Sequence, residues 1–272
     1  MSVSVNTNVS AMQALENLNL TTTELSQTQN IISTGLKVSS AKDNAAIYAI
    51  AQNQRSQVAA LDAVSSSLSR GQSVVDLAST AAQSISDLVS QMKQAALAAS
   101  DTSISTASRS AYATQFNSLR DQITQVSNNA SFDGANLLIT GASNLDSLSN
   151  TAGGVVTVLA QTMSLHGIGL TATASIATPT LAASWATALD TVQNTVNTKM
   201  GALGTYSTEL QNQITYVSHY QDALNTGIGN LVDANMAQES AKLQALQTKQ
   251  QLGVQSLSIA NQSPQLVLSL FK

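Results

Sequence analysis

The residues able to do acid–base or nucleophilic chemistry are few and scattered along this chain of 272 residues. The two histidines, His166 and His219, lie far apart, and neither belongs to a motif in which a second titratable group would complete an acid–base pair. Gly167 and Gly169 form a G-x-G fragment without the third glycine of a nucleotide-binding loop. Cysteine is absent, which excludes disulfides, thiolate metal sites and cysteine nucleophiles. The sequence therefore predicts no catalytic, metal or cofactor site.

The composition indicates helices that pack through small aliphatic side chains. Hydrophobic residues make up 43% of the chain, but aromatic residues only 3% and charged residues only 10%. So few charges are unusual for a surface that stays soluble alone, which favours an assembled final state. The net charge of −4, without a basic patch, argues against nucleic-acid binding.

Sequence rules for targeting point to the cytosol. No stretch approaches the roughly 18 to 20 apolar residues of a membrane span. No basic residue precedes Lys37, and no apolar run of suitable length precedes it either, so a cleaved secretory signal is not expected.

Long stretches in the middle of the chain have the heptad spacing of helices that pack along their length. No proline interrupts residues 44–100, and a capping residue at Asp43 or Asn44 is expected to open this helix. After a polar turn at residues 101–105, a second helix is expected to run back along the first. We interpret the seam of this bundle as an intramolecular core, formed by Leu61, Val64, Leu68, Val75, Ile85, Val89, Met92, Leu189, Val192, Val196, Leu203, Leu210, Val217 and Leu224.

The two ends of the chain carry weaker stripes of the same period, and we expect them to meet in space. The heptad phase shifts between Leu231 and Met236, which marks a boundary between two helical layers. The opposite charges of the two ends could favour their pairing, but exposed ion pairs contribute little. The residues predicted to make contacts between subunits are Leu15, Leu18, Leu25, Ile32, Met236, Leu243, Leu246, Leu257, Val267, Leu270 and Phe271.

One pair of terminal helices has only one mutual seam, which leaves other apolar residues without cover. Helices that lack a partner do not stay folded, so we expect ends that are disordered in the monomer and ordered by polymerisation. The apolar residues off the seam that need other copies of the chain are Leu20, Ile31, Leu252, Val254 and Leu266.

Residues 131–180 lose the helical spacing and become richer in glycine and threonine. Residues 155–159 and 170–176 are predicted to form short strands, with a turn at residues 166–169 between them. Pro179 is expected to close this region, whereas Pro264 either kinks the final helix or begins its last turns. The expected fold class is mainly α: an elongated rod, built from a long coiled-coil-like helical bundle with a small β-hairpin region.

Three motifs in these segments resemble those of the bacterial flagellins. The stretch STGLKVSSAKDNAA at residues 33–46 is similar to the family's connector and the start of its long helix. SFDG at residues 131–134 is similar to the motif that ends its second helix, and ANQSPQLVLSLF at residues 260–271 to its C-terminal signature. The short middle resembles the compact flagellins of alphaproteobacteria.

This resemblance implies an inner D0 layer made of the two chain ends and a D1 rod between them. The implied segments are an N-terminal D0 helix at residues 1–36, a spoke connector at 37–43, N-terminal D1 helices at 44–130, a β-rich part of D1 at 131–180, a C-terminal D1 helix at 181–231 and a C-terminal D0 helix at 232–272.

The resemblance also implies a structural role without catalysis. The implied function is a helical homopolymer, open to paralogous flagellins, that forms the flagellar filament for swimming. The implied partners are the flagellar export chaperone, the type III export apparatus, the filament cap and the hook–filament junction proteins. The implied location is extracellular, reached without a cleaved signal peptide, which replaces the cytosolic expectation. The alternative is the hook–filament junction component or another coiled-coil axial protein.

Two further expectations follow from the resemblance. Many flagellins carry, on the long helix, a cluster of charged residues that a toll-like receptor reads. Gln91, Gln94 and Ala95 depart from that pattern, so weak or no receptor activation is expected. The residues 131–180, rich in serine and threonine, are a candidate for O-linked sugars.

Overall fold

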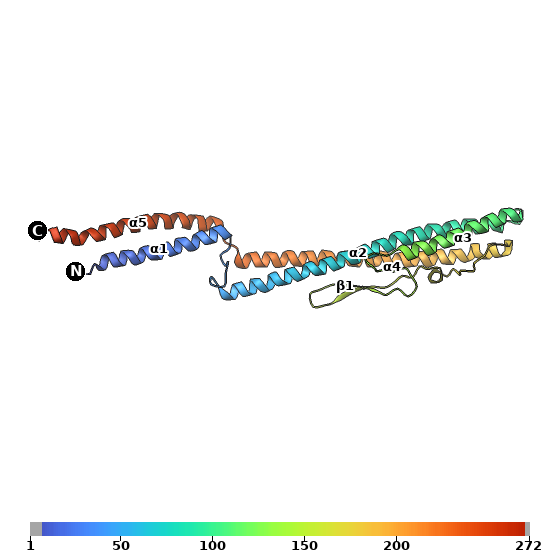
Figure 1. Cartoon of the computed structure of the whole chain (residues 1–272), viewed down its shortest axis with the longest axis horizontal. Helices are drawn as coiled ribbons and strands as arrows, with labels where there is room; N and C mark the ends of the chain where they lie inside the picture. Colours follow the sequence, from blue (N-terminus) through green and yellow to red (C-terminus); the bar gives the residue numbers. More distant parts are fainter. Residues whose placement is uncertain (1–6, 270–272) are drawn as a thin grey trace. The chain divides into compact units, whose positions relative to one another are not determined.

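The computed structural model describes residues 7–269, with side chains through residue 262. Over this range the chain forms helices α1 (Val9–Thr34), α2 (Ala45–Ser100), α3 (Thr106–Asn129), α4 (Pro179–Val232) and α5 (Met236–Ser269), strands β1 (Leu145–Leu148) and β2 (Val155–Val158), and a 3-10 helix at His166–Ile168 (Figure 1). The expected mainly α fold with a small β-hairpin is confirmed. Contacts divide the chain into two compact units, residues 57–222 and the two ends up to 56 and from 223 onward.

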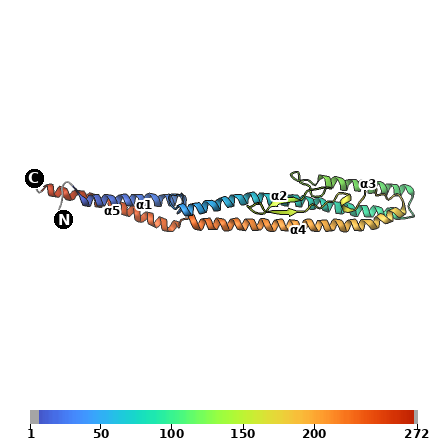
Figure 2. The same ribbon diagram turned by 90° about the horizontal axis from the view of Figure 1, so that it is seen from below.

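Polar contacts fix the register of α2 against α4 in the unit of residues 57–222. Gln221 donates to the Asp62 carboxylate, Gln72 to the Ser207 hydroxyl and Gln193 to the Ser86 hydroxyl, at 2.7–2.8 Å. The partner numbers rise on one helix as they fall on the other, so the helices run antiparallel and side by side (Figures 1 and 2).

The heptad seam of the sequence lies between these helices and α3. The fourteen seam residues named above are buried, with the exception of the half-buried Leu224. Phe116, Leu119 and Ile123 of α3 join them in the core. The stripe of each helix is thus covered by the other helices of this unit, as amphipathic helices require.

The α2–α3 turn depends on one buried arginine. Arg109 of α3 donates from Nε to the carbonyl of Ala99 at 3.0 Å and from Nη2 to the carbonyl of Asp101 at 2.8 Å. Ser105 caps α3 by accepting a hydrogen bond from the Ser108 amide. The last carbonyls of a helix have no intrahelical partner, so Arg109 supplies a donor where α2 needs one.

The β-hairpin packs on α2 and α4. Strands β1 and β2 are antiparallel, with Leu145 opposite Val158 and Leu148 opposite Val155. The amide of Leu148 donates to the Ser67 hydroxyl of α2 at 3.0 Å, and Gln213 of α4 donates to the Ser149 carbonyl at 2.9 Å. The expected strand at residues 155–159 is confirmed as β2.

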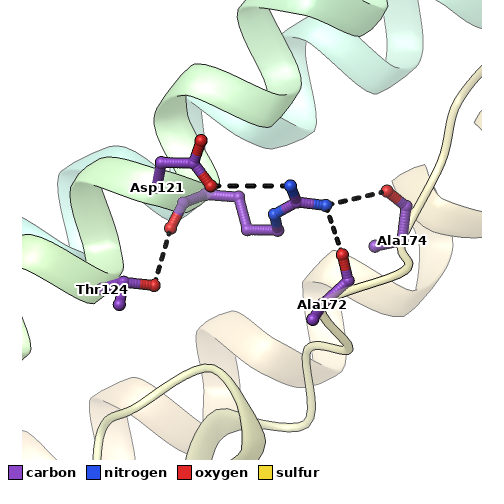
Figure 3. Close-up of polar contacts among 5 residues, drawn as sticks. Asp121, Thr124, Ala172 and Ala174 are labelled. Carbon is purple, nitrogen blue, oxygen red and sulfur yellow. Dashed lines mark hydrogen bonds and ion pairs between the residues drawn. The ribbon is translucent and has the colours of Figure 1, made fainter.

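The predicted strand at residues 170–176 is wrong, so the turn predicted at residues 166–169 is present but does not join two strands. Residues 166–168 form a 3-10 helix, and the partner of β2 is β1. Local turns satisfy the amides of Leu170 and Ala174. Figure 3 shows Arg120 of α3 donating to the carbonyls of Ala172, at 2.6 Å, and Ala174, at 3.4 Å. The amides and carbonyls that would pair with a second strand are therefore already bonded, the carbonyls of Ala172 and Ala174 to Arg120 and the amides of Leu170 and Ala174 within turns.

Single residues define the end of α1 and the starts of α2 and α4. The Asn44 side chain accepts from the Ile47 amide at 3.0 Å and opens α2, as predicted. Gly35 ends α1 with φ 72° and donates from its amide to the Ile31 carbonyl at 2.8 Å; this left-handed conformation favours glycine. Pro179 is the first residue of α4, where a missing amide hydrogen costs nothing. In the described backbone α5 continues through Pro264.

Candidate self-assembly surface

The terminal helices α1 and α5 pack against each other within one unit. Asn8, which caps α1, donates from Nδ2 to the Ala260 carbonyl at 2.8 Å, and at the other end of α1 Leu36 forms an antiparallel bridge with Asp233. These contacts show that α1 and α5 run antiparallel, as the two views of the ribbon agree (Figures 1 and 2). The expectation from the sequence that the two chain ends meet is met over the described residues.

The connector that follows α1 and the connector that precedes α5 are also held together. The Lys37 amide donates to the Val232 carbonyl at 2.8 Å, and the Ala234 amide to the Gly35 carbonyl at 2.9 Å. The Lys37 ammonium donates to the Asn230 carbonyl at 3.0 Å. Two backbone hydrogen bonds and one lysine side chain therefore hold the two connectors together at this end of the helix pair.

A short apolar seam lies between α1 and α5. Leu25 and Leu246 are buried, and a Cβ on Gly253 would lie 3.2 Å from the Leu18 side chain, so glycine allows a close approach there. Of the other predicted intersubunit residues, Leu18, Ile32, Leu243 and Leu257 are half-buried, and Leu15 and Met236 are exposed. The Val267 side chain, Leu270 and Phe271 lie outside what the structure describes.

The outer faces of both helices expose large apolar side chains. On α1 the exposed fractions of Val9, Met12 and Leu20 are 66%, 55% and 59%. On α5 those of Leu252 and Ile259, which are seven positions apart and share one side, are 58% and 63%, and that of Val254, on a different side of the helix, is 54%. Single exposed apolar residues are normal, but a contiguous apolar face marks an interaction site.

The exposed residues of α1 share one face of the helix. Val9, Met12 and Leu20 follow helical spacing, and a shallow groove along this face is lined by Met12, Leu15, Glu16, Asn19, Leu20 and Thr23. Sequence reasoning placed Leu20, Leu252 and Val254 off the seam but missed Val9, Met12 and Ile259. The signal that could have found them is helical spacing: Met12 is three positions from Val9 and eight from Leu20, and Ile259 is seven positions from Leu252.

The residues first considered for chemistry are not brought together. His166 lies in the 3-10 helix and His219 on α4, and both are exposed. Within residues 7–269, no group of three or more His, Asp or Glu side chains could hold a metal ion. None of the helices in that range is both long and apolar enough to cross a membrane.

Comparison with known proteins identifies the helical segments. The model of the bacterial flagellin N-terminal helical region matches residues 5–143, and that of the bacterial flagellin C-terminal helical region matches residues 186–271. The chain belongs to the bacterial flagellins. It is of the short alphaproteobacterial type, and as a flagellin it is a structural subunit of the flagellar filament.

Full-length relatives support the assignment to the flagellins. Flagellin FljM of Caulobacter vibrioides is 51% identical over 269 residues, which cover 99% of this chain and 98% of that protein. A flagellin of Brucella melitensis is 37% identical over 288 aligned residues, covering 99% of both chains. The fold is shared with a solved structure from Vibrio parahaemolyticus, described as a flagellar hook-associated protein, with a TM-score of 0.60, 14% identity, and coverage of 70% of this chain and 100% of that one.

Proposed function

We propose that this flagellin polymerises through the outer faces of α1 and α5, and that its central helical unit serves as the rigid body of each subunit. The observation that carries the proposal is the exposed apolar face of α1, formed by Val9, Met12 and Leu20. Burying a side chain of this size stabilises a contact by about 1.5–3 kcal/mol. Several such residues on each helix supply a driving force that one chain alone cannot use.

The contact between copies is heterologous in this proposal. A face on α1 and a different face on α5 join without closing on themselves, and a contact of this kind propagates as a helical filament. The central seam of α2 and α4 is already buried inside one chain, so it is not available for polymerisation. In these terms D0 comprises residues 1–36 and 232–272, and D1 the residues between the connector and residue 231.

Family membership supports the remaining parts of the proposal. The filament lies outside the cell, and the subunit reaches it through the flagellar type III export apparatus without a cleaved signal peptide. An export chaperone, the filament cap and the hook–filament junction proteins are its other partners, and the subunit performs no catalysis. Mass spectrometry of filaments sheared from intact cells tests this location: recovery of the chain only in the cytoplasmic fraction contradicts it.

Seeded polymerisation of the purified chain tests the role of the terminal helices. The Leu20→Ser variant is expected to raise the critical concentration for polymerisation about tenfold, because about 1.4 kcal/mol of lost contact energy corresponds to that factor. Leu97→Ser is the matched control, since Leu97 of α2 is 62% exposed and Leu20 is 59% exposed.

The readouts are sedimentation and electron microscopy of the polymers. Micrometre-long filaments from the unchanged chain support a filament subunit, whereas a chain that only caps the seeds is a junction component. Equal critical concentrations for Leu20→Ser and the unchanged chain contradict a polymerisation surface on the outer face of α1. If Leu97→Ser raises the critical concentration as much as Leu20→Ser does, the polymerisation surface is not confined to the terminal helices.

A further inference from the structure

Helices α1 and α5 carry opposite charges that do not pair with each other within the described part of one chain. The charged residues of α1 are Glu16 and Glu24, and the lysines of α5 are Lys242 and Lys249. Among residues 7–262 no ion pair joins α1 to α5; Lys242 lies 4.0 Å from Glu239 of its own helix. The charge attraction that the sequence offers between the two ends is therefore not used inside the chain.

Glu16 lies within the exposed apolar face of α1. Val9 lies seven positions before Glu16, Met12 four positions before it and Leu20 four positions after it. These spacings place all four residues on one side of the helix. Glu16 also lines the shallow groove of this face. Any partner that covers the apolar residues will therefore remove the Glu16 carboxylate from water.

Lys249 has the corresponding position on α5. Leu252 and Ile259 follow it by three and ten positions and are exposed on the same side of the helix. Lys249 is itself exposed. The α5 face thus combines apolar residues with an ammonium group, as the α1 face combines them with a carboxylate.

We propose that the Glu16 face of α1 in one copy packs on the Lys249 face of α5 in a neighbouring copy, so that the two charges form an intersubunit ion pair. This deepens the proposed polymerisation and depends on it. Leaving a buried charge without a partner is strongly unfavourable, and like charges brought together are repulsive. Contact of two α1 faces would join two carboxylates, and contact of two α5 faces would join two ammonium groups. Only the α1–α5 contact pairs opposite charges, and because it is heterologous it continues from copy to copy.

Charge reversal in the full-length chain tests this ion pair through the critical concentration for seeded polymerisation. Glu16→Lys and Lys249→Glu are each expected to raise it at least about tenfold, since like charges then meet in every contact. The double variant Glu16→Lys/Lys249→Glu is expected to return to within about twofold of the unchanged chain. Glu209→Lys, which makes the same charge change at an exposed residue of α4, is the control and is expected to polymerise normally.

Mixing the two single variants shows whether the pair joins different copies. Each copy of Glu16→Lys keeps the native Lys249, and each copy of Lys249→Glu keeps the native Glu16. The new ammonium group of the first variant can then meet the new carboxylate of the second. An equimolar mixture is therefore expected to form filaments at concentrations where neither variant does alone.

Three results would overturn the ion pair. If the double variant polymerises like the unchanged chain but the mixture of single variants does not, residues 16 and 249 pair within one chain and not between copies. Single reversals that polymerise normally, or a double variant no better than either, show that the two charges do not meet. Failure of the unchanged chain to polymerise would instead contradict the proposed function itself.

Discussion

Gly71 of α2 lies directly against Ser147 of β1, so close that a Cβ at residue 71 would collide with the Ser147 hydroxyl. Ser147 is buried and its hydroxyl has no hydrogen-bond partner. The Leu210 side chain of α4 is the next neighbour, at 3.7 Å from the same Cβ position. The hairpin thus rests on the central helices at a site that only glycine can occupy without movement.

The substitution Gly71→Ala is expected to destabilise the central unit by up to about 2 kcal/mol. Alanine gains about 1 kcal/mol in helix propensity, but overpacking of a buried contact costs about 1–3 kcal/mol and displaces the hairpin. Removing the opposing hydroxyl in Gly71→Ala/Ser147→Ala should recover most of the loss, because that hydroxyl makes no hydrogen bond. Urea unfolding of the monomer, followed by circular dichroism, measures both variants.

Gly204 supplies the matched control for this prediction. It also lies inside a long helix, α4, but apart from its neighbours along that helix nothing lies within 4 Å of a Cβ placed there. Gly204→Ala should therefore stabilise the chain by about 0.5–1 kcal/mol through helix propensity alone. If both glycine variants shift stability in the same direction, the contact with Ser147 is not what constrains residue 71.

Replacing Arg109 with leucine is expected to destabilise the α2–α3 turn by about 2 kcal/mol. The buried guanidinium donates to the Ala99 and Asp101 carbonyls, and hydrogen bonds to charged groups contribute about 1.5–3 kcal/mol. Arg70→Leu is the control, because its ion pair with Asp133 is exposed and such pairs contribute about 1 kcal/mol or less. Denaturant unfolding compares the two, and equal losses would show that Arg109 acts only as surface charge.

The helices with strong heptad spacing could be predicted from the sequence. The segments whose conformation depends on a contact with one distant side chain could not. The buried heptad from Leu61 to Met92 is a periodic signal that survives without tertiary information. The failed strand at residues 170–176 has the alternation of a strand, but its carbonyls bind Arg120, which lies some fifty positions earlier in the chain. Strand β1, with the sequence LDSL, is too short and too polar for its pattern to be distinctive.

The same limit applies to the candidate assembly surface. The sequence indicates apolar stripes on both terminal helices, but not which residues face the partner helix of the same chain. The predicted Leu25 and Leu246 are buried within the chain, whereas Val9 and Ile259, which were not predicted, are exposed. The rotation of each helix about its axis depends on contacts such as that of Gly253 with Leu18. A heptad pattern interrupted by polar residues and glycine does not determine that rotation.

Acid is expected to loosen the connector between α1 and α2. Asp43 accepts hydrogen bonds from the Ser39 hydroxyl and from the Ser40 and Ser39 amides, which together lower its pKa below the usual 3.8. A lowered folded pKa means that the turn is stabilised at pH values above 3.8 and that this is lost as the pH falls through the lower, folded value. The amide resonances of Ser39 and Ser40 in the monomer should therefore titrate with a midpoint below 3.8. Asp43→Asn should abolish that transition, and a midpoint above 3.8 would contradict the assignment.

Hydrogen exchange is expected to be fast in α1 of the monomer and slow in the filament. Of the described side chains of α1 and α5, only those of Leu25, Thr28 and Leu246 are buried. The Thr28 hydroxyl and Oε2 of Glu239 are buried without a hydrogen-bond partner, which costs further free energy. A helix pair with so little buried apolar surface is marginal alone, so its amides open locally far more often than those of the central helices. Mass spectrometry of peptides from α1, with peptides from the buried part of α2 as the internal reference, measures the difference. If α1 were as well protected as α2 in unpolymerised subunits, α1 and α5 would form a stable pair without neighbouring copies. Polymerisation would then not be what orders them.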